Sequence, residues 1–237
     1  MPAYNAARTL RETWTAIPAG VVHEVLLVDD HSADATVEVA SELHIRTIAL
    51  PHNVGYGGNQ KACYLEALRT GAEVVVMLHP DGQYDPRMIP EMIKPICSGE
   101  ADIVLGSRML VPGAARRGGM PLYRFLANKT LTWVENAVMG TNFSELHTGY
   151  RAYSRQFLAT VPFLRNSDDF VFDTQLIAQA VAFGQRVLEI PIKTRYHPDA
   201  SSTDAAANFR YGMGTLWTMA AFRLHRGGLV RSRLFLP

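Results

Sequence analysis

The chain of 237 residues is long enough for one large α/β domain or two small ones. Hydrophobic residues make up 48% and charged residues 19%, as in ordinary globular proteins, and the net charge of +1 gives no reason to expect nucleic acid as a partner. Two cysteines without metal-ligand spacing, no signal peptide and no apolar run of about 18 residues together predict a cytoplasmic protein without a membrane-spanning helix.

The first two-thirds of the chain alternate between strands and helices. Ser32 is a suitable N-cap for the first helix of this series, and Gly71 closes the second. Continuous apolar strands between helices predict an α/β fold of Rossmann-like type, with a mostly parallel sheet covered on both faces. Such a unit normally begins with a strand, which is apparently missing before Pro2. The expected strands are 24–30, 45–50, 73–78 and 101–108, and the expected helices are 32–43, 53–71 and 85–97.

From Met109 onward the alternation breaks. A loop rich in Gly, Pro and Arg leads into an amphipathic helix, and Pro191 marks the last strand as an edge strand. The tail contains five arginines and no acidic residue. The pattern predicts one domain, 1–204, followed by a basic amphipathic helix and tail, 205–237. The later elements are expected at Leu122–Met139 (helix), 148–155 (strand), 168–184 (helix) and 186–196 (strand).

Polar residues gather where the predicted strands end, which is the edge at which open parallel sheets bind ligands. Asp29 and Asp30 follow one strand, and either they contact a ligand or they only favour the start of the next helix. Arg108 ends another strand. The glycine-rich turn 53–58 would let backbone approach a ligand closely, although its spacing matches no phosphate-binding fingerprint.

The most informative strand end is "HPDGQ", residues 79–83. Alternate residues of an extended segment point the same way, so His79, Asp81 and Gln83 are expected to face one point. Carboxylate and amide oxygens suit Mg²⁺, and imidazole suits Mn²⁺ at least as well. The sequence therefore predicts a site for Mg²⁺ or Mn²⁺. His79 either binds the metal directly or holds a metal-bound water.

Seven segments together carry a family resemblance that covers residues 2–196. Their order and spacing resemble the family 2 glycosyltransferases with the GT-A fold, and most of all the branch that mannosylates or glucosylates polyprenyl (dolichol-type) phosphates. The resemblance implies an inverting, metal-dependent transfer of a hexose from a donor such as GDP-mannose or UDP-glucose to a polyprenyl phosphate. The segments are "PAYNA", "LLVDDHSADAT", "NVGYGGN", "HPDGQYDP", "GSRM", "TGYRAYSR" and "DFVFDTQLIAQA".

The resemblance also implies roles for individual residues. Asp81 and Gln83 match the metal ligands of the family's Asp-x-Asp-x-Gln signature, and His79 stands where the family has its first carboxylate. Catalysis would involve Asp81, Arg108 and Glu145. The acceptor phosphate would contact Arg117, Arg124 and Asn128. The implied donor-binding residues are Pro2, Ala3, Tyr4, Asn5, Asp29, Asp30, Asn53, Gly57, Asp81 and Arg108.

The acceptor decides whether a general base is needed. A lipid phosphate is already anionic at pH 7, whereas a saccharide or lipid hydroxyl must lose a proton, and Glu145 is then the candidate base. Glu145 could equally be a structural acid. A third hypothesis is a nucleotide-sugar-binding protein without catalysis, because the first strand is missing and His79 departs from the signature. The segment Tyr196–Ser202 also lacks the family's usual basic residues.

The tail combines arginines with large apolar residues, which is typical of helices that lie on anionic membranes. We therefore expect a peripheral protein at the inner face of the membrane. There are two alternatives. The tail could pack on its own domain, or it could pack on a second subunit, and the chain would then be a homo-oligomer.

Overall fold

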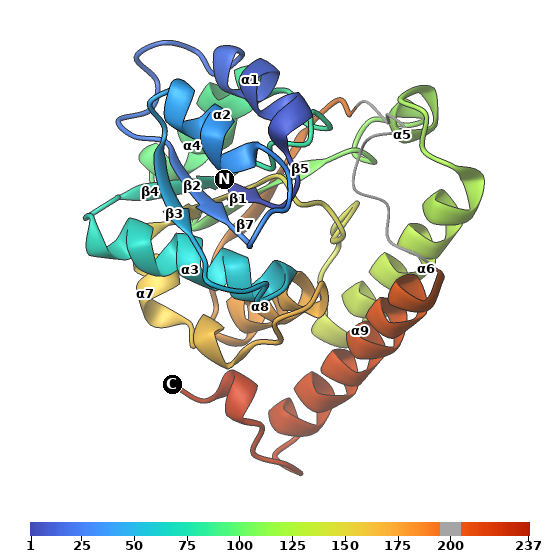
Figure 1. Cartoon of the computed structure of the whole chain (residues 1–237). Coiled ribbons are helices and arrows are strands. Elements are labelled where there is room, and N and C mark those ends of the chain that lie inside the picture. The colour runs from blue at the N-terminus through green and yellow to red at the C-terminus, as the bar shows by residue number, and fades with distance from the viewer. Residues whose placement is uncertain (195–204) are drawn as a thin grey trace.

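The computed structural model describes residues 1–194 and 205–237, and its strands form two sheets surrounded by helices (Figure 1). The segment Tyr196–Ser202 therefore lies outside the described residues, and so does the predicted domain boundary at 204, which stays a prediction. The first sheet is parallel and contains β1 (Pro2–Ala3), β2 (Leu26–Asp29) and β3 (Arg46–Ala49). The second has the order β4 (Val74–Met77), β6 (Arg151–Ser154), β5 (Ile103–Ser107) and β7 (Val187–Pro191).

The second sheet is mixed rather than parallel throughout. β6 runs antiparallel to both β4 and β5, whereas β5 and β7 are parallel. An apolar strand pattern carries no information on direction, so the sequence did not reveal this reversal. In the part of the chain that the structure describes, β7 pairs with β5 alone and forms an edge, which confirms the prediction made from Pro191.

A strand does precede the opening turn, so the prediction that the first strand is missing was wrong. β1 has only two residues, and it pairs with β2 through Pro2 opposite Val28 and Ala3 opposite Asp29. The N–H of Asp30 extends the ladder by donating to the carbonyl of Ala3 at 2.8 Å. Two residues are too few to show an alternating pattern, and only their backbone pairing defines the strand.

The helices that the sequence predicted lie close to their expected positions, and α2 differs in how it begins. Ser32 does not cap this helix, because its hydroxyl contacts the Asp29 carboxylate and the helix begins four residues later. Asp34 instead accepts a hydrogen bond from the N–H of Thr36 at 3.0 Å. The helices are α1 (Ala7–Thr15), α2 (Thr36–Glu42), α3 (Tyr56–Arg69), α4 (Ile89–Cys97), α5 (Ala114–Arg117), α6 (Leu122–Met139), α7 (Arg155–Thr160), α8 (Val171–Ala182) and α9 (Ala205–Arg226), with short 3₁₀ turns η1 (Pro86–Met88), η2 (Phe163–Arg165) and η3 (Arg233–Phe235).

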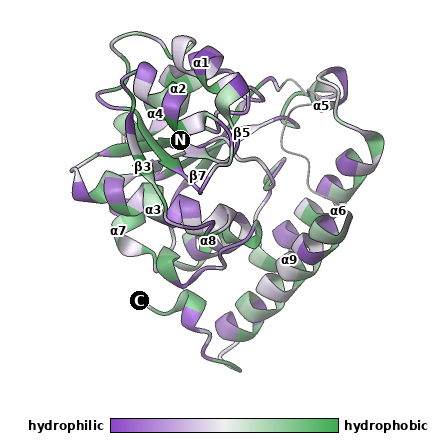
Figure 2. Cartoon of the chain, viewed as in Figure 1, coloured by the Kyte–Doolittle hydropathy of each residue, from purple (hydrophilic) through white to green (hydrophobic). Residues whose placement is uncertain are grey.

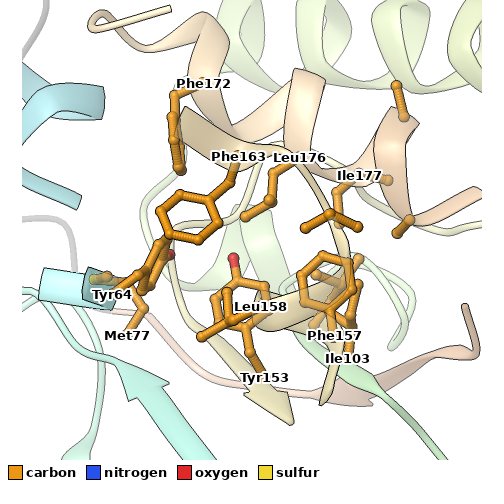
Figure 3. Packing of buried hydrophobic residues seen from close by; sticks show 14 of the residues in the cluster. Tyr64, Met77, Ile103, Tyr153, Phe157, Leu158, Phe163, Phe172, Leu176 and Ile177 are labelled. Atoms are coloured by element: carbon orange, nitrogen blue, oxygen red, sulfur yellow. The ribbon is translucent and has the colours of Figure 1, made fainter. Parts of the chain in front are cut away.

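The hydrophobic core has two main parts. One is rich in aromatic rings, with Tyr64, Tyr153, Phe157 and Phe172 fully buried between helices and the second sheet (Figure 3). The other packs α1, α2 and α4 against the sheets around residues such as Leu27. Hydrophilic and hydrophobic residues alternate along the surrounding helices, as expected of helices with one side on a core (Figure 2).

The helix of the basic tail is packed against the domain. α9 lies beside α6 and also contacts α8 (Figure 1). Thr215, Met219 and Phe222 on its inner side are buried. Two glycines of α9 differ sharply in their surroundings. A Cβ added at Gly214 would lie 2.4 Å from Cγ2 of Val171 in α8, whereas a Cβ at Gly212 would meet nothing within 4 Å.

This contrast gives a test of the α8–α9 contact. Gly212→Ala and Gly214→Ala both gain about 1 kcal/mol of helix propensity, so their difference isolates packing. We expect Gly214→Ala to unfold with a free energy about 1–3 kcal/mol below that of Gly212→Ala, because the added methyl group overpacks Val171. Urea unfolding measures both values, and equal stability of the two variants would contradict the packing described.

Candidate functional site

A cavity of about 220 Å³ lies at the carboxyl ends of β4 and β5. Four of the residues that line it were predicted from the sequence, namely His79, Asp81, Gln83 and Arg108. The others come from α3, from the segment after β4, from the segments before β6 and α8, and from α8 and α9 themselves. They include Tyr56, Tyr84, His147, Gly149, Phe170, Asp173, Asn208 and Tyr211, to which sequence analysis gave no role.

The three predicted metal ligands meet in the cavity, although not for the reason expected. β4 ends at Met77, and the following residues form a turn rather than an extended strand. The N–H of Gln83 donates to the Asp81 carboxylate at 3.0 Å, and Gly82 has a φ of +72°. The turn, not strand alternation, brings the side chains to one cavity.

His79 is half-buried and held by an aromatic neighbour. Its ring stacks on Tyr56 with 5.5 Å between centroids, and Nε2 lies 3.4 Å from the Tyr56 hydroxyl. Burial lowers the pKa of His79, although the charges of Asp81 and Asp173 oppose this. The ring is therefore neutral near pH 7 and chemically able to bind a metal. Its contact with Tyr56 equally suits a role in holding a water, so both hypotheses for His79 stay open.

Asp173 is a second cavity carboxylate that sequence analysis missed. It accepts hydrogen bonds from the Tyr56 hydroxyl at 2.8 Å and from Gln60 at 3.2 Å. Nη1 of the fully buried Arg151 lies 3.5 Å from the same carboxylate. Two features of the sequence could have pointed to this pair. Asp173 is the one acidic residue in an otherwise uncharged α8, and Arg151 is the one arginine in β6. Neither shows by itself that the two side chains meet.

Arg108 and Glu145 form a buried ion pair at the cavity wall. The backbone N–H of Arg108 donates to one carboxylate oxygen of Glu145 at 2.7 Å, and its Nε donates to the other at 2.8 Å. Burial alone would raise the pKa of Glu145, but the charge and hydrogen bonds of Arg108, with a further bond from Asn128, hold this pKa below its ordinary value. Glu145 is thus an ionised carboxylate whose observed contacts orient Arg108.

The three predicted acceptor-binding residues do not come together. Asn128 is buried and donates to Glu145 at 2.8 Å. Nε of Arg124 donates to the Tyr123 hydroxyl at 3.1 Å. Arg117 is exposed and donates to the carbonyl of Pro112 at 3.2 Å. None of the three lines the cavity, so their contact with an acceptor stays a prediction.

Most of the predicted donor-binding residues form a separate cluster at the ends of β1 and β2. The Asp30 carboxylate accepts hydrogen bonds from the N–H groups of Val54 at 2.7 Å and Gly55 at 3.1 Å. Asp29 accepts one from the N–H of Ser32 at 2.9 Å, and the Asn5 side chain accepts one from Ala33 at 2.8 Å. Asp30 and Asn5 therefore join three loops, those after β1, after β2 and before α3.

Other members of this cluster frame the loops. Pro2 and Ala3 are buried in β1, whereas the side chain of Tyr4 is exposed. The Asn53 amide donates to the carbonyl of Asp30 at 3.2 Å. The Thr9 hydroxyl contacts the carbonyl of Pro80, which places this cluster next to the 79–83 turn. Donor contact at these residues stays a prediction.

The structure gives Gly57 a packing requirement. Its N–H donates to the carbonyl of Asp168 at 2.7 Å, and an added Cβ would lie 2.4 Å from the carbonyl oxygen of Ser167. The close backbone approach that Gly57 permits is therefore to the chain's own 167–169 segment. Its predicted contact with the donor is untested.

The donor atoms around the cavity suit a hard divalent cation that also binds phosphate oxygens. Such sites need only one or two carboxylates, with the remaining positions taken by phosphates and waters. Asp81 provides a carboxylate and Gln83 an amide oxygen. Among residues 1–194 and 205–237 no group of three or more His, Cys, Asp or Glu forms a metal centre by itself. The residues present therefore fit a cation that arrives with a diphosphate.

Comparison with known proteins decides the family. The model of "Glycosyl transferase family 2" matches residues 1–161, more than half of the chain. The chain belongs to glycosyltransferase family 2. The polyprenol monophosphomannose synthase of Mycolicibacterium smegmatis is 28% identical over 90% of this chain and 82% of that protein. The undecaprenyl-phosphate mannosyltransferase of Micrococcus luteus is 27% identical over 81% of this chain and 80% of that protein.

Solved structures show the same fold. Glucosyl-3-phosphoglycerate synthase from Mycobacterium tuberculosis, in complex with Mg²⁺ and UDP, has a TM-score of 0.71 at 19% identity and covers 98% of this chain and 79% of that one. Its complex with Mn²⁺, UDP and phosphoglyceric acid has a TM-score of 0.70 at 18% identity and covers 94% of this chain and 76% of that one. The GT-A fold class is confirmed.

The buried pair predicts a pH-dependent effect of Glu145→Gln. The pKa of Glu145 is lowered on folding, so its charge stabilises the fold above about pH 4.5, its ordinary pKa, and this contribution is lost as the pH falls through the lower folded value. We expect Glu145→Gln to lower the unfolding free energy by about 3 kcal/mol at pH 7, because Arg108 loses its partner. The difference from wild type should shrink by pH 4.

The control is Glu42→Gln, which removes an exposed pair with Arg11. It should change the unfolding free energy by less than about 1 kcal/mol at pH 7. Urea unfolding at both pH values measures all three proteins. The buried ion pair would be contradicted if Glu145→Gln lowered the unfolding free energy only slightly at pH 7, or by the same amount at both pH values.

Proposed function

We propose that this chain is an inverting hexosyltransferase that uses a nucleotide-diphosphate sugar, of the GDP-mannose or UDP-glucose type, and a polyprenyl phosphate acceptor. The observation that carries the proposal is the meeting of Asp81 and Gln83 with Arg108 in one cavity at the strand ends. Named relatives support the acceptor class, including the UDP-N-acetylglucosamine–dolichyl-phosphate N-acetylglucosaminyltransferase of Methanococcus voltae, 25% identical over 83% of this chain and 84% of that protein.

Asp81, Gln83 and, in one hypothesis, His79 would hold Mg²⁺ or Mn²⁺. The cation would supply positive charge next to the leaving nucleoside diphosphate. Arg108 adds a guanidinium whose direction is fixed by Glu145, and a preoriented positive charge needs no rearrangement as the leaving group becomes more negative. The acceptor would attack the anomeric carbon from the opposite side, which inverts its configuration.

The state of Glu145 supports an acceptor that needs no base. Its carboxylate is fully buried, is absent from the cavity lining, and is held ionised by Arg108 and Asn128. A carboxylate with a lowered pKa and occupied oxygens is a poor proton acceptor. A lipid phosphate, already ionised, places no such demand.

The second candidate is transfer to a saccharide or lipid hydroxyl in cell-envelope polysaccharide synthesis. The observation that favours it is a carboxylate in the cavity lining, Asp173, although its oxygens already accept hydrogen bonds from Tyr56 and Gln60. The acceptor that stimulates nucleotide release distinguishes the two. Donor binding without release would instead favour the third hypothesis, a binding protein without catalysis.

The site assignment predicts that Asp81→Ala abolishes metal-dependent turnover, by at least about a hundredfold. Nucleotide release from GDP-mannose and UDP-glucose, with Mn²⁺ or Mg²⁺ and with or without polyprenyl phosphate, measures this. The control is Asp85→Asn, because Asp85 is exposed, caps η1 and does not line the cavity. Unchanged turnover in Asp81→Ala would contradict the assignment.

We further propose that α6 and α9 form the membrane-contacting surface, which we call the outer face. Across the described residues no helix is long and apolar enough to span a bilayer. Both helices nevertheless expose large apolar side chains, with Trp133 70% and Trp217 77% exposed. Arg210 and Arg223 are exposed on the same helix as Trp217. The outer face consists of Leu122, Tyr123, Leu126 and Trp133 of α6 and Phe209, Met213, Leu216, Trp217 and Leu224 of α9.

This composition fits the interfacial region of an anionic bilayer, where tryptophan and arginine side chains are both stabilised. It would place the protein at the inner face of the membrane, next to a lipid acceptor. A second subunit seated on the outer face is the competing explanation.

Vesicle binding tests the outer face. We expect Trp133→Ala combined with Trp217→Ala to weaken binding to vesicles of anionic phospholipid at least about tenfold, because each indole buries apolar area worth about 1.5–3 kcal/mol. Co-sedimentation at low and high salt measures binding, and sedimentation velocity shows whether wild type is a dimer. The control is Leu65→Ala, an exposed apolar residue of α3 on the other side of the domain (Figure 1). Equal vesicle binding by wild type and the double variant would contradict the proposal.

A further inference from the structure

His147 lies where the cavity meets the helix pair α6 and α9. Its Nε2 is 2.9 Å from the carboxylate of Glu135 in α6, and its Nδ1 contacts the hydroxyl of Tyr211 in α9. The Tyr211 ring approaches the imidazole edge-on with 5.5 Å between centroids. The side chains of His147 and Glu135 are only 8% and 1% exposed. One buried ring thus joins both helices to a residue of the cavity wall.

The backbone around His147 is fixed by two arginines. The carbonyls of Leu146 and Thr148 accept hydrogen bonds from the buried Arg151 guanidinium at 3.0 and 2.7 Å. The carbonyl between them, that of His147, accepts one from Nη2 of Arg108 at 2.9 Å. The Glu145 carboxylate and the carbonyl of His147 therefore both help to orient Arg108. The position of the His147 main chain helps to set where the Arg108 charge lies.

The side-chain partners of His147 depend on it electrostatically. A carboxylate as buried as that of Glu135 is costly unless a cation or N–H group faces it, and the Nε2 of His147 lies 2.9 Å from it, although the pair lacks hydrogen-bond geometry. Burial, together with the charge of Glu135, raises the pKa of Tyr211, so its phenol stays protonated and keeps its bond with Nδ1. Loss of the imidazole would leave two buried polar groups of α6 and α9 without this shared partner.

We propose that His147 is a positioning residue for Arg108, through which the seating of α6 and α9 on the domain sets the geometry of the cavity. The proposal rests on the proposed function only where turnover is the readout. Without the imidazole, the 146–148 segment loses its link to Tyr211 of α9 and to Glu135 of α6, and the carbonyl that helps to hold Arg108 is held only by the backbone contacts of its neighbours. Arg108 keeps its charge but not its direction, so the catalytic step suffers more than donor binding.

Amide hydrogen exchange tests the structural half of the proposal without any substrate. The N–H of Arg108 bonds to Glu145 at 2.7 Å and reports on the order of the wall. We expect His147→Ala to raise exchange at Arg108 about tenfold or more, and His147→Gln, which keeps one hydrogen bond, to raise it less. The control is Thr215→Val, which removes a buried contact of 3.4 Å between the hydroxyls of Thr174 and Thr215, linking α8 and α9. It should leave exchange at Arg108 unchanged.

Steady-state kinetics test the functional half. We expect His147→Ala to lower kcat about tenfold while the donor Kd, measured by calorimetry, stays within about twofold, and Tyr211→Phe to show part of the same loss. Because His147 acts through Arg108, the effects of the two substitutions should not multiply. The fold loss of kcat in the double variant His147→Ala, Arg108→Lys should be smaller than the product of the fold losses in the two single variants.

Three outcomes would overturn the proposal. Equal exchange at Arg108 in His147→Ala and Thr215→Val would make His147 an ordinary packing residue. A raised donor Kd with unchanged kcat would place His147 in contact with the donor, and multiplicative losses would separate it from Arg108. If wild type shows no turnover with any donor, the proposed function fails, while the exchange experiment still decides the role of His147.

Discussion

The buried ion pair between Arg108 and Glu145 is the interaction on which the cavity depends. Glu145 is fully buried and is bonded by the main chain and side chain of Arg108 and by Asn128 of α6. Removal of one partner would leave a charge without compensation in a medium of low dielectric constant, which commonly costs about 3–5 kcal/mol. The pair therefore fixes the end of β5 to the segment before β6 and to α6. The position of a cationic group in the cavity follows from this fixed arrangement.

A second buried arginine has the same effect on the opposite side of that segment. Arg151 is fully buried and donates to three carbonyls, those of Leu146, Thr148 and Asp173. The segment between α6 and β6 thus has few ways to move, although it contains no helix or strand. This explains how a loop can carry cavity residues with defined positions. Arg151 also connects α8, which carries Asp173, with the side of the cavity that contains Arg108.

The sequence predicted the elements well where periodicity is strong. The helix Leu122–Met139 has the predicted bounds, and the strand ends that carry Asp81 and Arg108 do meet at one cavity. Predictions failed where only backbone pairing or local turns decide the outcome, as in the two-residue β1 and the 79–83 turn. Spacing on a helix also does not show which contacts each residue makes, since Arg124 and Asn128 are one turn apart and have different partners.

Sequence analysis missed His147, Asp173 and Tyr211 for one reason. They come from three distant elements, and only tertiary packing shows that they face one cavity.

The most direct test of the account is the chemical structure of the product. The purified chain is incubated with a ¹³C-labelled nucleotide sugar, Mn²⁺ or Mg²⁺, and vesicles that contain polyprenyl phosphate, and the product is analysed by NMR. The account predicts a glycosyl phosphate whose anomeric configuration is inverted relative to the donor. A sugar linked to a hydroxyl, or a retained configuration, would contradict it.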